Sequence, residues 1–423
     1  MADSRSTTQW TATAFRHRPL ICLVVLGCFA CSASGVEPSW NQWRGQSRDG
    51  TVPPQTWPES LDGLSLEYER PLSPSYSGPI VHGSMVFTTE TVDQARERVT
   101  AWDLASGDQV WKTEWDGAMA VPFFAASNGS WIRSTPAVVD GYLVTLGMRD
   151  LMVCLDPNSG DERWRVDFPK QLGTPLPSFG GVCSPLIDDD AVYIQTGGCL
   201  AKLKLDSGQV IWKSLEDAGG MMSAGAFSSP VIATLAGKRQ LVVQTRSELT
   251  GVDLETGNVL WNEPIEAFRG MNILTPLVMG DRVFTSAHTG RAQMFQVSRS
   301  GDKFSVDEVW RQKTRAYMSS PVIAGDQIIC HLQNQRVAAL GIEDGKIRWT
   351  SQPFGKYWSM IANQGRILAL DNSGDLLLVD GEADRLSIID QSKVADDAWA
   401  HLAIHNDLLL VRDLKALKVY RWK

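Results

Sequence analysis

Hydrophobic and polar positions along the chain follow a repeated pattern. Each copy opens with a small residue and proline, continues with an apolar run, turns at Gly or Asp, and enters a second apolar run. Segments 134–144 and 319–329 are clear copies. Two short apolar runs joined by such a turn predict a β-hairpin. The copies are marked by Pro79, Pro136, Pro185, Pro230, Pro276 and Pro321, with Met360 and His401 in the same place in two copies without proline.

A second turn follows in most copies, and its spacing to a tryptophan is fixed. The stretch from Asp103 to Gly107 leads to Trp111, four residues past the glycine. The same spacing gives Trp111, Trp164, Trp212, Trp261 and Trp349. Glycine supplies the positive φ that a tight turn needs. Each copy therefore predicts four antiparallel strands, A to D. We interpret the recurring tryptophans as packing between units, because one spacing in five copies indicates architecture.

Eight copies, roughly 39 to 57 residues apart, predict an all-β, eight-bladed β-propeller of four-stranded antiparallel blades. Seven blades is the alternative, if the copy at Met360 merges with a neighbour. The last copy ends after its strand C, at residues 416–422. We expect the segment 64–70 to supply the missing strand D, with Tyr68 in the tryptophan position. This closure would leave no open sheet edge.

The N-terminal stretch resembles a targeting signal. Basic residues 16–18 precede an apolar run at 20–30, and small residues follow, which is the order of a secretory signal peptide. The run is shorter than the roughly 20 residues needed to cross a bilayer. Residues 25–28 loosely resemble a lipoprotein cleavage box, so Cys28 is a candidate for lipidation, with plain periplasmic release as the alternative.

These features divide the chain into three parts. Residues 1–35 are the expected secretory or lipoprotein signal, 36–63 an N-terminal lead-in, and 64–423 the propeller. We therefore expect an exported protein that is periplasmic or an outer-membrane lipoprotein.

Charge and cysteine content narrow the function classes. The net charge is −8, and signal removal shifts it to about −10, since three Arg and one Asp are lost. An acidic protein is a poor candidate for binding nucleic acid, whose affinity depends on Lys and Arg. The cysteines outside the signal form no C-x-x-C pair: Cys154, Cys183, Cys199 and Cys330. We interpret them as small buried apolar side chains.

The D-x-x-[ST]-G-x-x-x-W turns and the x-P-x-x-x-x-G openings resemble those of the quinoprotein-like, or PQQ-repeat, β-propeller family. The resemblance covers about Leu64 to Lys423, and residues 40–50 resemble the start of exported bacterial members. That family contains quinone-dependent dehydrogenases. It also contains non-enzymatic scaffolds, such as the lipoprotein propeller of the outer-membrane β-barrel assembly machinery. The resemblance implies a fold, and the function depends on the site.

For the dehydrogenases, the resemblance implies a vicinal disulfide, a stacking tryptophan, a calcium ion and an Asp base. This chain has no adjacent cysteines after its signal. The run 188–190 is its densest set of carboxylates, but neighbours in one turn rarely converge on one ion. We therefore expect no PQQ, no calcium and no catalytic residues. The chain resembles the assembly propeller more than the dehydrogenases. The alternatives are a quinone-dependent alcohol or sugar dehydrogenase and a polysaccharide- or peptide-binding sensor.

A partner surface is expected on the face that carries the D–A and B–C connections, which strand alternation places together. We call it the D–A/B–C face. Its expected aromatic and Arg residues are of the types enriched at interface hot spots. The candidates are Tyr76, Arg133, Arg149, Phe227, Arg246, Tyr317, Trp358, Trp399 and Arg412. The alternative is that the aromatics only plug the channel. The expected partner is an envelope protein or a cell-surface polymer, with membrane contact only through a lipid anchor.

Overall fold

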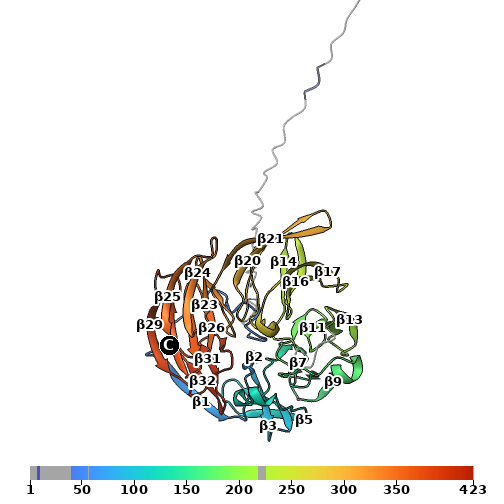
Figure 1. Ribbon diagram of the computed structural model, residues 1–423, viewed down its shortest axis with the longest axis vertical. Helices are drawn as coiled ribbons and strands as arrows, with labels where there is room; N and C mark the ends of the chain where they lie inside the picture. Colours follow the sequence, from blue (N-terminus) through green and yellow to red (C-terminus); the bar gives the residue numbers. More distant parts are fainter. Residues whose placement is uncertain (1–6, 10–39, 56, 218–224, 423) are drawn as a thin grey trace, which may run out of the picture. The chain divides into compact units, whose positions relative to one another are not determined.

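Eight four-stranded antiparallel sheets are arranged around a central axis in the computed structural model, as Figure 1 shows. The structure describes residues 7–9, 40–55, 57–217 and 225–422. The prediction of an eight-bladed propeller is confirmed, and the copy at Met360 forms a blade of its own. Cys28 and all of the expected signal except residues 7–9 lie outside the described residues. No helix within the described ranges has the length and hydropathy needed to cross a membrane.

The first four blades each run from strand A to strand D in sequence order. Blade one contains β2 (Ile80–His82), β3 (Met85–Val92), β4 (Arg96–Asp103) and β5 (Gln109–Asp116). Blade two contains β6 (Ala137–Val139), β7 (Tyr142–Leu146), β8 (Leu151–Leu155) and β9 (Glu162–Asp167). Blade three contains β10 (Leu186–Asp188), β11 (Ala191–Gln195), β12 (Leu200–Lys204) and β13 (Val210–Ser214). Blade four contains β14 (Val231–Leu235), β15 (Lys238–Gln244), β16 (Glu248–Asp253) and β17 (Val259–Pro264).

The other four blades complete the ring. Blade five contains β18 (Leu277–Met279), β19 (Arg282–Ser286), β20 (Ala292–Ser300) and β21 (Lys303–Gln312). Blade six contains β22 (Val322–Ala324), β23 (Gln327–His331), β24 (Arg336–Gly341) and β25 (Ile347–Pro353). Blade seven contains β26 (Trp358–Asn363), β27 (Arg366–Asp371), β28 (Asp375–Asp380) and β29 (Ser387–Lys393). Blade eight contains β30 (Ala403–His405), β31 (Leu408–Arg412), β32 (Ala416–Arg421) and β1 (Ser65–Pro71).

Within the described residues, three short helices lie in D–A connections: η1 (Phe123–Asn128), α1 (Phe168–Leu172) and η2 (Phe268–Gly270). Helix α1 begins where the Asp167 carboxylate accepts the backbone N–H of Lys170 at 3.2 Å, and Pro169 suits its first turn. The helices therefore elaborate the loops of one face and leave the sheets unchanged.

The N-terminal strand closes the ring, as predicted. Strand β1 pairs antiparallel with β32, from Ser65 opposite Arg421 to Pro71 opposite Ala416. Tyr68 sits opposite Val419, beside a one-residue bulge. The first and last segments of the propeller are thus joined by a full ladder, and blade eight has no unpaired C-terminal edge.

A bulge in every strand D aims one side chain at the next blade. In blade one Trp111 pairs with Ala101 while Gln109 pairs with Trp102, so one residue is left unpaired. The same shift occurs at Tyr68, Trp164, Trp212, Trp261, Trp310, Trp349 and Asp390. A bulge bends the strand and redirects a side chain. The repeat therefore includes a geometric device as well as a tryptophan.

The redirected ring packs on the glycine of the next blade's C–D turn. A Cβ on Gly160 would lie 2.5 Å from Trp111 Cε3, and the Trp111 indole N–H donates to the Pro157 carbonyl at 2.9 Å. Tyr68 repeats this contact on Gly107 and donates its hydroxyl to Leu104. Trp164, Trp212 and Trp310 make the same pair of contacts with the following blade.

Three blades depart from this pattern. In blade six the Trp349 indole N–H donates to the Ala383 carbonyl of blade seven at 3.1 Å, but no described glycine lies against its ring. Trp261 donates to Gln240 in its own blade, because the next hairpin, β20–β21, is longer and carries its Gly301 turn away from other atoms. Blade seven has Asp390 at the tryptophan position. Its carboxylate accepts the backbone N–H of Leu61, and Trp57 of the lead-in packs nearby with the C-terminal blade. The lead-in therefore occupies the place where blade seven lacks an aromatic ring.

The lead-in also plugs the axis. Backbone N–H groups of Val81 and Val138, in blades one and two, donate to Trp40 and Asn41 at 2.9 Å. The buried guanidinium of Arg48 donates to the Pro185 carbonyl at 2.8 Å, and buried Arg44 donates to that of Pro321. Carbonyls of the blade openings thus solvate the plug's two buried cations by hydrogen bonding.

A second ring of contacts involves the small residue before each opening proline. The N–H of Gly78 donates to Thr135 Oγ1 in blade two, and that of Thr135 donates to Ser184 Oγ in blade three. Ser184 repeats the contact with Ser229, and Thr275 with Ser320. We call these residues the hydroxyl belt. They tie neighbouring blades together next to the axis, and a buried N–H without such a partner would be costly.

We expect Gly160→Ala to destabilise the fold by about 2 to 4 kcal/mol. About 1 kcal/mol comes from a non-glycine residue at positive φ, and the rest from the collision with Trp111. Gly237→Ala is the matched control, since Gly237 has nearly the same φ and no atom within 4 Å of its added Cβ. Urea unfolding measures both variants. Equal losses would show that the ring-on-glycine contact contributes nothing.

Candidate functional site

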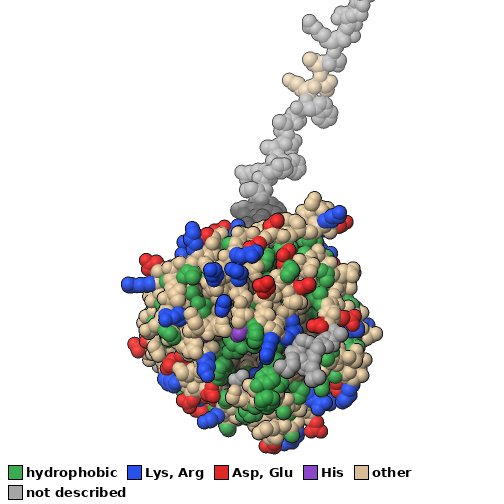
Figure 2. All heavy atoms as spheres, in the orientation of Figure 1, with side chains coloured by type: hydrophobic (Ala, Val, Ile, Leu, Met, Phe, Trp, Pro, Cys, Tyr) green, Lys and Arg blue, Asp and Glu red, His purple; other side chains and the backbone are tan. Residues whose placement is uncertain are grey.

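The D–A connections surround a cavity at the axis. Its volume is about 330 Å³, and all eight D–A connections contribute to it. Figure 2 shows hydrophobic and basic side chains around a central hollow of the disk. We call it the axial cavity. It is lined by Trp43, Tyr76, Arg133, Val182, Ser184, Phe227, Ser229, Ile273, Thr275, Tyr317, Met318, Lys356, Tyr357 and Trp399.

One position of the repeat supplies the wall. In each copy the residue three before the opening proline position lines the cavity: Tyr76, Arg133, Val182, Phe227, Ile273, Met318, Tyr357 and Trp399. In blade eight the opening position belongs to Leu402. The placement of His401 there was wrong by one residue, because β30 pairs with β31 from Ala403 opposite Leu410. The eight equivalent connections thus bring eight equivalent side chains to one axis.

Five of the nine predicted partner residues line this cavity: Tyr76, Arg133, Phe227, Tyr317 and Trp399. Two others flank it on the same face. Arg149 is exposed in the B–C loop of blade two, and the half-buried Arg246 lies over the Phe227 ring at 5.4 Å. The expectation that the D–A and B–C connections share a face is therefore consistent with where these residues lie. Whether they bind a partner stays a prediction.

The remaining two candidates are not available on this surface. Trp358 is 1% exposed and packs in the core between blades six and seven, since it begins strand β26 instead of ending a loop. Arg412 is also 1% exposed, and it donates to the carbonyls of Thr89 and Ser73 at 2.6 and 2.8 Å. The exposed role expected of both is wrong. Trp358 fills the core, and Arg412 joins blade eight to blade one.

The aromatic side of the cavity is held in place by contacts that do not involve a ligand. Trp399 donates its indole N–H to Asp397 at 2.6 Å and stacks on Tyr357, with ring centroids 6.0 Å apart. Tyr76 lies 6.0 Å from Trp399 on its other side. Burial raises the pKa of the Tyr357 hydroxyl to about 12, so it stays protonated. These rings form a fixed, neutral wall.

The charged side of the cavity is basic. The Arg133 guanidinium donates to the carbonyls of Phe179 and Gly129 at 3.1 and 2.9 Å, and lies over Tyr76. Burial lowers its pKa from the usual value. Lys356 is exposed at the mouth. Among the described residues that line the cavity, these are the two cations, and none is a carboxylate.

Sequence reasoning missed several residues of this region. Trp43, from the lead-in, reaches the cavity and donates its indole N–H to Thr275 at 2.8 Å. Phe123 and Phe124 are 90% and 48% exposed in helix η1. A constant offset of three residues before the proline position would have selected Tyr357 over Trp358. Nothing in the repeat pointed to Trp43, because it lies outside the copies.

Buried carboxylates order the B–C loops around Arg149. Glu97 accepts the N–H of Met148 at 2.6 Å and that of the Trp115 indole at 3.0 Å. Asp150 accepts the N–H of Gly197 in the next blade, while its other oxygen has no partner. Burial raises the pKa of Asp150 to about 7. The loops of blades one to three are thus linked through two buried carboxyl groups.

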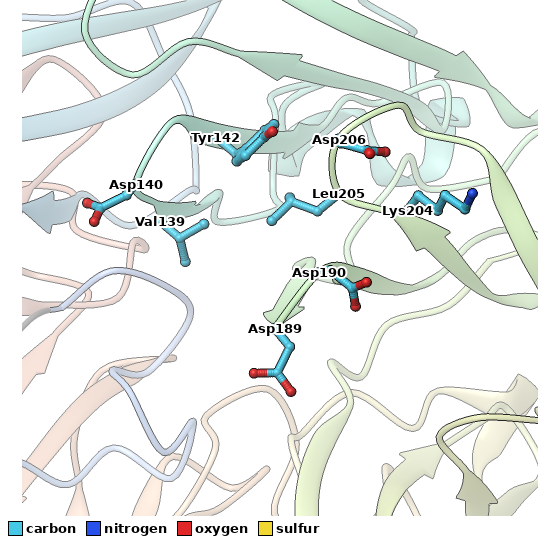
Figure 3. Close-up of a pocket in the computed structure, with 8 residues that line it drawn as sticks. All are labelled: Val139, Asp140, Tyr142, Asp189, Asp190, Lys204, Leu205 and Asp206. Carbon is cyan, nitrogen blue, oxygen red and sulfur yellow. The ribbon is translucent and has the colours of Figure 1, made fainter.

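The opposite face carries a different hollow, drawn in Figure 3. It lies at the turns of blades two and three and is lined partly by Asp140, Asp189, Asp190 and Asp206. The four carboxylates point away from one another. Asp188, beside them, pairs with Arg239 at 2.9 Å. Within the described ranges no three His, Cys, Asp or Glu side chains are grouped to hold a metal ion. The four cysteines Cys154, Cys183, Cys199 and Cys330 are buried, as interpreted from the sequence, and they are free.

Comparison with known proteins decides between the members of the propeller class. A family model described as outer membrane protein assembly factor BamB matches residues 95–351, more than half of the chain. The chain belongs to the BamB family. A BamB from Yersinia pestis is 23% identical over 308 residues, which cover 70% of each chain.

Solved structures confirm the fold and leave the function open. The crystal structure of BamB from Moraxella catarrhalis has a TM-score of 0.64 and 14% identity, covering 85% of this chain and all of that one. A quinohemoprotein alcohol dehydrogenase from Comamonas testosteroni has a TM-score of 0.63 and 10% identity, covering 91% and 80%. Because a BamB and an alcohol dehydrogenase match almost equally, shape alone does not separate them.

Trp358 and Trp399 should respond differently to truncation. We expect Trp358→Ala to cost about 3 to 5 kcal/mol, because it leaves a cavity in the core between two blades. Trp399→Ala removes a half-buried ring at the cavity and should cost less than half as much. Thermal unfolding of both variants tests this. Equal losses would mean that Trp399 is a core residue as well.

Asp150 should make stability depend on pH. Its folded pKa of about 7 lies above the unfolded value, so the folded state binds the proton more tightly. The free energy of unfolding should therefore fall as pH rises from about 4 through 7. We expect Asp150→Asn to be more stable than the unchanged protein at pH 8, with the difference shrinking at pH 5. Urea unfolding between pH 5 and 8 would contradict this if the difference were constant.

Proposed function

We propose that this protein is a non-enzymatic scaffold of the bacterial envelope that binds a partner protein through its D–A/B–C face during outer-membrane assembly. Membership of the BamB family supports the assembly role. The observation that carries the choice of face is the axial cavity with its ring of aromatic and basic side chains. Hot spots of protein interfaces are enriched in these residue types. The opposite face consists mainly of turns that the repeat itself requires.

The donor set of the axial cavity argues against the quinone-dependent alternative. Calcium binding needs several convergent oxygen ligands, usually with carboxylates among them. Besides three tyrosine phenols, the described lining residues offer the three aliphatic hydroxyls of Ser184, Ser229 and Thr275, and no carboxylate. Two of these hydroxyls already accept belt hydrogen bonds, and the third accepts from Trp43. The residues present do not fit a calcium–quinone pair, and a lack of redox turnover stays our prediction.

The proposal includes export and an anchor at Cys28. The order of basic, apolar and small residues supports export, and the cleavage-box resemblance supports lipidation. After Cys28→Ser, we expect the mature protein to move from the membrane fraction to the soluble periplasmic fraction. A mutant that is still cleaved and still membrane-bound would contradict lipidation at this residue.

Exposed side chains on the D–A/B–C face give a test of the assembly role. In a strain of the source organism that lacks this protein, we expect lower levels of outer-membrane β-barrel proteins. The unchanged protein should restore them, and the double variant Phe123→Ser, Arg149→Glu should not, because it removes an exposed ring and reverses a charge on that face. Immunoblots of outer-membrane fractions measure the levels.

The control is Lys204→Glu, which reverses the charge of an exposed side chain on the opposite face. It should restore the levels fully. Normal levels in the strain without the protein would contradict the assembly role. Full restoration by the double variant, at equal abundance and melting temperature, would contradict the choice of face.

A further inference from the structure

The axial cavity has the dimensions and lining of a specific pocket. Its volume of about 330 Å³ lies near the lower end of small-ligand sites, which span roughly 300 to 1,000 Å³. Six of its lining residues are aromatic, and Trp43 closes it toward the plug. A group of one or two rings fits this space, since aromatic rings pack edge-to-face or offset against one another.

Charge defines the second requirement. The protein as a whole is acidic, at −8, yet the cavity carries Arg133 and Lys356 without a lining carboxylate. Arg133 is anchored by two backbone carbonyls, so its guanidinium is fixed before anything binds. A partly buried cation gains most from a ligand carboxylate, which forms charge-assisted hydrogen bonds with it. The cavity is therefore complementary to an aromatic group beside a negative charge.

The rings outside the cavity indicate a polypeptide. Phe227 in the wall lies 6.0 Å from Phe179, which lies 6.1 Å from Phe124. Phe124 in turn lies 5.7 Å from the 90% exposed Phe123. This series of rings leads from the cavity to the rim of the face. A free small molecule would use only the cavity, whereas a chain can place one side chain inside and continue over the rings.

We propose that the axial cavity binds an aromatic side chain flanked by carboxylates in an extended segment of the partner protein. The proposal rests on the proposed function and adds the chemistry that the partner segment presents. The aromatic ring enters between Phe227 and the Tyr76–Trp399 wall, and the flanking carboxylates pair with Arg133 and Lys356. Trp43 limits the depth of insertion.

Peptide binding to the mature full chain tests this pocket. The probe is a fluorescein-labelled, capped peptide, Ser-Gly-Asp-Phe-Asp-Gly-Ser, followed by fluorescence anisotropy. Replacement of its Phe by Ala should weaken binding at least tenfold. Replacement of both Asp by Lys should weaken it by a similar factor. Equal affinity for all three peptides would overturn the proposal. So would a lack of binding of the first peptide at concentrations up to about 1 mM.

Two variants locate the binding. Lys356→Met changes an exposed side chain and should lower peptide affinity about fivefold without changing the melting temperature. Phe227→Ala opens the wall and should weaken binding at least tenfold. Lys204→Met on the opposite face is the matched control and should have no effect. Unchanged affinity in both cavity variants would overturn the proposal. If Phe227→Ala is unstable, unchanged affinity in Lys356→Met is enough to overturn it.

A competitor shows whether the aromatic anion belongs to a polypeptide or to a free small molecule. N-acetylphenylalanine carries the ring and one carboxylate but no chain. We expect it to compete at least tenfold more weakly than the peptide, and tighter binding of the small molecule would overturn the choice of a polypeptide. Suppose that the cavity variants bind the peptide with unchanged affinity, while the double variant Phe123→Ser, Arg149→Glu still fails to restore outer-membrane proteins. The pocket proposal then fails and the assembly proposal stands. If the double variant also restores them, the choice of face fails with the pocket, and the assembly role fails only if outer-membrane protein levels are normal in the strain that lacks the protein.

Discussion

The contact on which the structure depends is an aromatic ring against a glycine of the next blade. Each blade is a four-stranded sheet that cannot bury both faces alone, so the ring of blades is stable only if neighbours interlock. The bulge in strand D aims Trp111 outward from its own sheet, and Gly160 leaves space for it by lacking a Cβ. A hydrogen bond from the indole to the following blade fixes the ring's direction. Repetition of this contact in five of the eight blades helps to set the angle between blades.

That angle determines what reaches the axis. Once the blades are held at constant spacing, the hydroxyl belt joins their openings and the residues three before them point to one centre. The fold thus supplies a cavity of fixed outline, while the identity of each lining residue is free to vary. Phe227 and Arg133 stand at equivalent positions, yet one offers a ring and the other a charge. The lining side chains, which the fold does not require, therefore determine the binding specificity.

The sequence predicted the blades well because each depends on local spacing. Gly-to-Trp intervals and proline openings are read along one copy, and even the closure by Tyr68 followed from the repeat. The site was harder, because it depends on register across copies. Trp358 was chosen where a shift of one residue selects Tyr357, and in a strand one residue reverses the direction of the side chain.

Residues outside the repeat could not be placed from the sequence. Trp43 reaches the axial cavity because Arg44 and Arg48 hold the lead-in to blade openings far away in the chain. Arg412 looked like a loop cation, and its burial depends on carbonyls of blade one that only ring closure brings near. Such contacts join segments hundreds of residues apart, so local sequence patterns cannot predict them.

The central claim is that the D–A/B–C face meets a protein in the envelope. A photocrosslinking amino acid placed at Arg149, at Arg246 and, on the opposite face, at Lys204 tests it in intact cells. We expect one protein adduct of the same size from Arg149 and Arg246 and none from Lys204. Adducts from Lys204 alone, or the same adducts from all three positions, would contradict it.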